Sequence, residues 1–379
     1  MYLIRLTQRK DLWKNDLGRP SWIDGTSISL DAFVSGVASE TGAVLENGVA
    51  SENRAALGSS AGVQSLRAIS HSIRMMQLRS SQGDLHVGDC FDVEVRYEEG
   101  DVTRSVLVII GDLQAFEGLC QGTTLGMTLV CGSVGDRFGA GQRGGDLLLI
   151  GDAGSEALMD KRNGWSLIHG NVGDRFAGPA PGDLSGMRGG DTMVLGNVGD
   201  RACERMRRGS VYIQGRVGEY LAHSWIAGTI YIDGQLERQW CTGMRRGSLL
   251  LREPKVAECG ASLSISRSCE LSFLPILWKH IRSLVNKTAT ELRSPLFSGG
   301  SQDDSFCDYR TSCRMVESQE ADTAVAMEQF IERLPTSNQV ARCFGDLELD
   351  GQGEILVFGE FADMDLQVGN SRLQVAEES

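Results

Sequence analysis

The chain has 379 residues, 47 of them glycine, with aromatic residues at 6% and a formal net charge of −13. Glycine at about twice its usual share predicts an architecture set by the backbone, and the lack of a three-residue glycine period excludes collagen. Residues 301–379 hold 17 acidic residues against 5 arginines, so the remainder is nearly neutral and offers no extended basic stripe for nucleic acid.

The cysteines and the amino terminus predict a reduced, cytoplasmic protein. None of the 10 cysteines has a CxxC partner, which argues against a structural zinc site. The first residues, MYLIRLTQRK, lack the apolar core of a signal peptide, and no run of about 18 apolar residues could span a membrane. We therefore expect neither a membrane nor a nucleic acid among the partners.

The N-terminal segment, residues 1–84, is mixed in composition. Its stretch from Gly36 to Gly62 is rich in glycine, alanine and serine and is predicted to be a flexible surface loop. The sequence LHVGDCFDVEVRY, residues 85–97, predicts a turn followed by a strand. The sequence VLVIIGDL, residues 106–113, predicts a further strand where the repeats begin.

A repeat of 19 residues fills the middle of the chain. A glycine precedes each of seven short apolar runs at steps of 19, 19, 26, 19, 19 and 19 residues, and a second glycine follows six residues later in each complete unit. These structural glycines are Gly126, Gly132, Gly145, Gly151, Gly164, Gly170, Gly190, Gly196, Gly209, Gly215, Gly228 and Gly234. We predict that they form corners, where the backbone needs positive φ or passes close to the next coil.

The five residues between paired glycines predict strands, reading MTLVC, DLLLI, WSLIH, DTMVL, SVYIQ and TIYID. Because side chains alternate across a strand, the second and fourth residues share one face, which we assign to the interior. Each coil would bury this face only by stacking on its neighbours. The predicted fold class is therefore mainly β, a β-solenoid with small α/β flanking segments.

The third residue of each strand points the other way and is also apolar. This outward ladder comprises Leu129, Leu148, Leu167, Met193, Tyr212, Tyr231 and Leu250. A solvated strand face would be polar. We expect the ladder to be covered, either by flanking segments of this chain or by a partner subunit.

One repeat is 26 residues long, and its surplus lies within residues 176–190. The surplus predicts an external loop on an otherwise regular coil. Insertions of this kind often build binding surfaces in repeat proteins. A tolerated surface bulge is an equally good interpretation.

Charged residues recur with the same period. Two places before the first glycine stand Arg143, Arg162, Arg188, Arg207 and Arg245, and ten places after it stand Asp136, Asp174, Asp200 and Glu219. Mutual salt bridges between the two columns are one interpretation. The other is that guanidinium groups bind an anionic partner surface or the oligoglutamate tail of a cofactor. The candidate contacts for that tail are Arg188, Arg207, Arg208, Arg245 and Arg246.

After the repeats, Leu274-Pro275 opens a helical pattern that could cap the end of the coil. Residues 320–334 predict a second helix, 347–358 a hairpin, and Ser298 to Ser305 a polar linker. The predicted organisation is an N-terminal segment (1–84), a repeat domain (85–252), a helical cap with linker (253–300) and an acidic C-terminal segment (301–379).

No motif in the chain performs chemistry by itself. The five histidines are far apart in sequence, and no metal-ligand spacing or dinucleotide fingerprint is present. We therefore predict no catalytic residue and no metal ligand.

The repeats resemble a known domain. The segments GSVGDRFGAGQRGGDLLLIGDAG and GNVGDRFAGPAPGDLSGMRGGDTMVLGNVGD are similar to the GXGXG repeat domain that occurs in the C subunit of formylmethanofuran dehydrogenase, in the related bacterial formyltransferase/hydrolase complex, and in glutamate synthase. The long unit ending in GMRGG, together with LHVGDCFDVEV and LPILWKHI, resembles the formylmethanofuran dehydrogenase family in particular. The likeness covers residues 85 to about 290.

The resemblance implies a right-handed β-helix that acts as a non-catalytic structural subunit in one-carbon metabolism linked to methanofuran and tetrahydromethanopterin. The implied partners are an amidohydrolase-like hydrolase subunit, a formyltransferase subunit and a dehydrogenase-like subunit. This chain alone would bind no cofactor, while the complex would handle a methanofuran-type cofactor during formaldehyde oxidation to formate. The alternative is an interaction domain of the glutamate synthase type.

Overall fold

The computed structural model describes residues 2–9, 22–33, 45–46, 49–50, 60–97, 104–252, 259, 261, 263–265, 269–293 and 309–358. Of the predicted Gly36–Gly62 loop, the described residues are the short strands β3 (Leu45–Glu46) and β4 (Val49–Ala50) and the start of helix α2 (Ser60–Arg74). The rest of that loop and the predicted linker from Ser298 to Ser305 lie outside the described residues.

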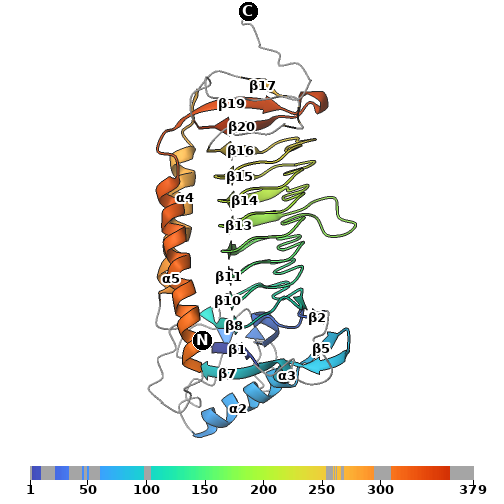
Figure 1. The fold of residues 1–379 in the computed structure, drawn as a ribbon, viewed down its shortest axis with the longest axis vertical. Coiled ribbons are helices and arrows are strands. Elements are labelled where there is room, and N and C mark those ends of the chain that lie inside the picture. Colours follow the sequence, from blue (N-terminus) through green and yellow to red (C-terminus); the bar gives the residue numbers. More distant parts are fainter. Residues whose placement is uncertain are drawn as a thin grey trace, which may run out of the picture.

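One mixed sheet of 14 strands runs along the molecule (Figure 1). Its centre consists of the repeat strands β10 (Met127–Cys131), β11 (Asp146–Ile150), β12 (Trp165–Ile168), β13 (Arg188–Val194), β14 (Arg208–Ile213), β15 (Thr229–Ile232) and β16 (Ser248–Leu251). Neighbouring strands pair in parallel at the repeat spacing, as in Leu129 with Leu148 and Tyr212 with Tyr231. The predicted strands are therefore confirmed.

The predicted right-handed β-helix is wrong. Each repeat contributes one regular strand, and these strands belong to a single large sheet that continues into both flanking segments. The return part of each repeat contributes isolated bridges, such as Val134 with Ala153, within the described ranges. The physical reason is left-handed backbone: in one return segment Arg201, Cys203 and Arg205 have φ of 56°, 57° and 51°, which interrupts extended structure.

N-terminal strands extend one end of this sheet. Strand β1 (Tyr2–Gln8) lies parallel to β8 (Val106–Ile110) and antiparallel to β7 (Phe91–Tyr97). The short helix α3 (Val87–Cys90) precedes β7, which confirms the predicted turn and strand. A smaller sheet beside them has the order β6 (Gly83–His86), β5 (Gln77–Ser80), β2 (Ile23–Asp24) and β9 (Phe116–Glu117).

C-terminal strands cover the other end. Strand β20 (Gly353–Val357) pairs in parallel with β16 as a further rung and forms a hairpin with β19 (Gln339–Gly345). The 3-10 turn η2 (Leu347–Leu349) lies between them, so the predicted hairpin is real but begins earlier than residue 347. Two short strands, β17 (Ser264–Ile265) and β18 (Cys269–Glu270), also pair with β19.

Two helices lie along the outward face of the sheet (Figure 1). Helix α4 (Leu274–Leu292) and helix α5 (Tyr309–Arg333) pack on the outward ladder, whose seven members are all buried. The ring of Tyr231 meets Trp278 at 5.4 Å and Phe330 at 5.9 Å. The chain therefore covers this ladder itself, which removes the ladder as an argument for a partner, and α4 lies along the sheet instead of across its end.

The repeat glycines meet two different demands. Gly145 and the other first-column glycines have positive φ, +64° at Gly145 itself, which favours glycine on steric grounds. At Gly196, in the second column, an added Cβ would lie 2.3 Å from the carbonyl oxygen of Gly170 in the preceding repeat. Any side chain there would push successive repeats apart.

Candidate interaction surface

Exposed arginines line the corner where several repeats enter their strands. The backbone fixes their spacing, because Arg207 N–H donates to Met187 O at 2.8 Å and Arg245 N–H donates to Trp225 O at 2.7 Å. Arg207, Arg208, Arg245 and Arg246 are exposed, and we call these four residues the arginine edge. Two repeats separate its halves, or about 10 Å at the usual strand spacing.

Two other arginines of the predicted column are occupied. Arg188 contacts Asp160 at 3.1 Å and Asp183 at 2.8 Å, and Arg162 contacts the same Asp160 at 2.9 Å. Arg188 therefore holds the insertion against the preceding repeat. Of the five predicted anion contacts, the structure separates Arg188 from the four residues of the arginine edge.

The acidic column does not pair with the arginine column. The Asp136 side chain accepts the backbone N–H of Ser155 at 2.7 Å, and Asp200 accepts that of Glu219 at 2.7 Å. Asp174 does the same toward the N–H of Asp200 at 2.9 Å. The predicted salt-bridge ladder is therefore wrong, because these short carboxylates satisfy backbone donors of the next repeat.

Within the described residues, no carboxylate forms an ion pair with any member of the arginine edge. Guanidinium groups bind carboxylates through two parallel hydrogen bonds, and exposed groups lose little hydration before such contact. The arrangement can therefore bind an acidic surface or a chain of carboxylates.

A buried lysine lies inside the repeats and was missed by sequence reasoning. Lys161 is completely buried, and its Nζ donates to Gln142 Oε1 at 2.6 Å and to Ser166 Oγ at 2.7 Å. Burial lowers the pKa of Lys161 to about 7, although the charges of Asp191 and Asp146 oppose that shift. The signal was available, because the equivalent place in the next two repeats holds Met187 and Met206.

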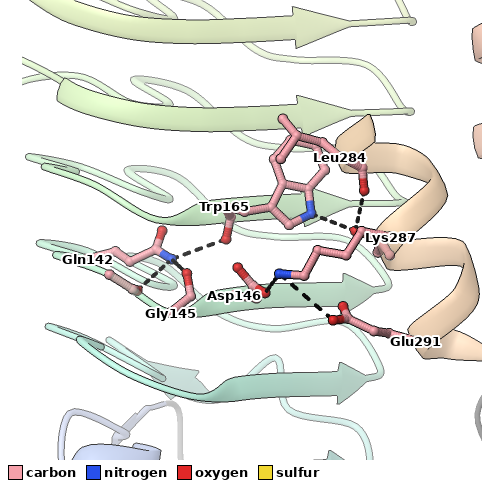
Figure 2. Close-up of polar contacts among 9 residues, drawn as sticks. Gln142, Gly145, Asp146, Trp165, Leu284, Lys287 and Glu291 are labelled. Carbon is pink, nitrogen blue, oxygen red and sulfur yellow. Dashed lines mark hydrogen bonds and ion pairs between the residues drawn. The ribbon is translucent and has the colours of Figure 1, made fainter. Parts of the chain in front are cut away.

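Polar contacts fasten α4 to the start of the repeat strands (Figure 2). The indole N–H of Trp165 donates to Thr288 Oγ1 at 2.9 Å in a buried position. Lys287 Nζ lies 2.7 Å from Asp146 and 3.8 Å from Glu291. Partial burial alone would lower the pKa of Lys287, but the hydrogen bond to Asp146 and the two acidic charges raise it. These contacts keep the outward face occupied.

The histidines have separate local partners. His280 pairs with Asp191 at 3.2 Å, His86 with Asp89 at 3.3 Å, and His223 lies 4.0 Å from Glu204. Among the described residues, no three His, Cys, Asp or Glu side chains are grouped as metal ligands. In that same part of the chain, every helix is too short or too polar to cross a membrane.

Together, the large sheet with its helical cover and the arginine edge define a repeat-built β protein with a charged surface suited to binding. No protein-family model and no curated protein sequence matches the chain. In fold it is similar to one chain of the X-ray crystal structure of the formyltransferase/hydrolase complex (FhcABCD) from Methylorubrum extorquens in complex with methylofuran, with a TM-score of 0.61 and 22% identity. The match covers 94% of this chain and 100% of that chain, so the two share a fold over almost their whole lengths.

Proposed function

We propose that this chain is a non-catalytic structural subunit in a formyltransferase/hydrolase complex, equivalent to the GXGXG-containing C subunit of formylmethanofuran dehydrogenase. The fold match across 94% of the chain supports this function, because it extends through both flanking segments as well as the repeats. The GXGXG resemblance of residues 85 to about 290 points to the same assembly. The chain's task would be to hold catalytic subunits in a fixed arrangement.

In this proposal the chemistry belongs to partner subunits. An amidohydrolase-like subunit and a formyltransferase subunit would act on formyl groups carried by a methanofuran-type cofactor, and a dehydrogenase-like subunit would complete the assembly. This chain would bind no cofactor alone. Its arginine edge would bind an acidic surface of a neighbour or carboxylates of the cofactor tail, since these four guanidinium groups lack ion-pair partners in the described structure.

Affinity purification of the tagged full-length chain from its native cells tests the proposal. We expect an amidohydrolase-like subunit and a formyltransferase subunit to co-purify in fixed ratio, as identified by mass spectrometry, with metal in the assembly. Recovery of the chain alone would refute the proposal. Co-purification with glutaminase or flavin subunits would instead support the glutamate synthase type of function.

A further inference from the structure

The hydrogen-bond register locates the insertion of the long repeat. Asp160 N–H donates to Gly178 O at 3.0 Å, and Gly186 N–H donates to Arg205 O at 2.8 Å. The regular repeat therefore leaves at Gly178 and resumes at Gly186. Residues 179–185 account for the difference between the 26-residue and 19-residue units, and they project from the stack beside β13 (Figure 1).

This seven-residue loop is held by several contacts. Asp183 N–H donates to Ala180 O at 2.9 Å, and the Asp183 carboxylate pairs with Arg188 at 2.8 Å. From the next repeat, the guanidinium group of Arg205 donates to Asp183 O at 3.4 Å. Pro179 and Pro181 further restrict the backbone. The loop therefore needs little ordering before it can bind, which lowers the entropy cost of association.

The loop presents one apolar side chain beside unpaired charges. Leu184 is 80% exposed, the highest value among the exposed large apolar residues of the described structure. The arginine edge begins in the adjacent repeat, because Arg207 N–H donates to Met187 O and Arg208 pairs in register with Arg188. A partner that meets this surface would encounter an apolar tip and guanidinium groups together.

We propose that loop 179–185 is a docking element that inserts Leu184 into an apolar socket on an acidic surface of a partner subunit. This inference rests on the function proposed above and specifies the surface by which the chain joins its complex. Charge complementarity selects the partner, since Arg207 and Arg208 flank the base of the loop and have no acidic partner in the described structure. A buried apolar anchor with a charged rim is the usual construction of a binding hot spot.

Three variants test the docking element in the tagged full-length chain. Leu184→Asp replaces the apolar tip, and deletion of residues 179–185 restores a 19-residue repeat. Leu349→Asp is the matched control, because Leu349 is also exposed, at 60%, but lies in η2 at the far end of the sheet. Circular dichroism and thermal melting check that each variant folds, and co-purification with hydrolase and formyltransferase subunits is quantified.

We expect Leu184→Asp and the deletion to reduce recovery of the partner subunits about tenfold or more, while Leu349→Asp retains them. If the wild-type chain retains its partners and both loop variants do too, the docking element is refuted while the proposed function stands. If the wild-type chain recovers neither subunit, the proposed function fails first. Loss of self-association, or of binding to a glutamate oligomer, with complex assembly unchanged would assign the loop to another occupant and overturn the inference.

Discussion

Replacing Lys161 with methionine should make the protein more stable near neutral pH and remove a specific pH dependence. The lysine amine is completely buried and donates to two oxygens, those of Gln142 and Ser166. Two donors suit a neutral amine, whereas an ammonium group carries a third N–H. Methionine has nearly the same volume and occupies the equivalent place in the next repeats, at Met187 and Met206.

The size of the effect follows from the pKa of Lys161. Its ordinary value is 10.5, and burial lowers it to about 7 in the folded chain. Between these values the unfolded chain binds more protons, so stability rises with pH. The penalty from this group is fully present below about pH 7 and vanishes above 10.5. At about 1.4 kcal/mol per unit it amounts to roughly 4 kcal/mol at pH 7 and roughly 1 kcal/mol at pH 10.

Lys161→Met removes this penalty but also two hydrogen bonds, each worth about 1 kcal/mol. We therefore expect the variant to be about 2 kcal/mol more stable at pH 7 and comparable to or less stable than wild type at pH 10. Urea unfolding at pH 7, 8, 9 and 10 under reducing conditions measures both, and other titrating groups cancel in the difference. Parallel pH profiles of the two proteins would refute a neutral buried amine.

Three further predictions concern the packing of the repeats. Gly196→Ala should prevent stable folding, because its methyl group would overlap the preceding repeat; Gly182→Ala, which meets no atom within 4 Å despite φ of +86°, should cost only about 1 kcal/mol in thermal melting. Thr288→Val should lower the free energy of unfolding by about 1–3 kcal/mol, since it leaves the buried indole N–H of Trp165 without its acceptor; an unchanged denaturation midpoint would contradict this. Burial raises the pKa of Cys203 to about 12, so its thiol should resist alkylation at pH 8 until the chain unfolds, as followed by peptide mass spectrometry.

The repeat strands could be predicted because two independent periods agree. Glycine spacing set the repeat, and alternation within each run separated the interior from the outward ladder. Leu148 and Tyr212 illustrate the result, because each pairs with its equivalent in the next repeat and is buried beneath a helix. Burial of the ladder by this chain could also be anticipated, although sequence did not decide between its own helices and a partner.

The return segments could not be predicted in the same way. Cys203 and Arg205 adopt left-handed backbone, which their residue types do not favour, so nothing in the sequence marked these places as turns. Spacing likewise suggested an acid–base ladder, yet Asp136 reaches the backbone of the next repeat before it can reach an arginine. The candidate contacts also divided unexpectedly, since Arg188 is occupied by Asp160 and Asp183.

The central claim is that this chain organises catalysis without performing it. Formate release from a formylmethanofuran-type donor should therefore be measured for the purified chain and for the assembly isolated through it, at equal chain concentration. We predict release by the assembly and only background release by the chain alone. Turnover by the isolated chain at the rate of the assembly, or an assembly without any release, would contradict the account.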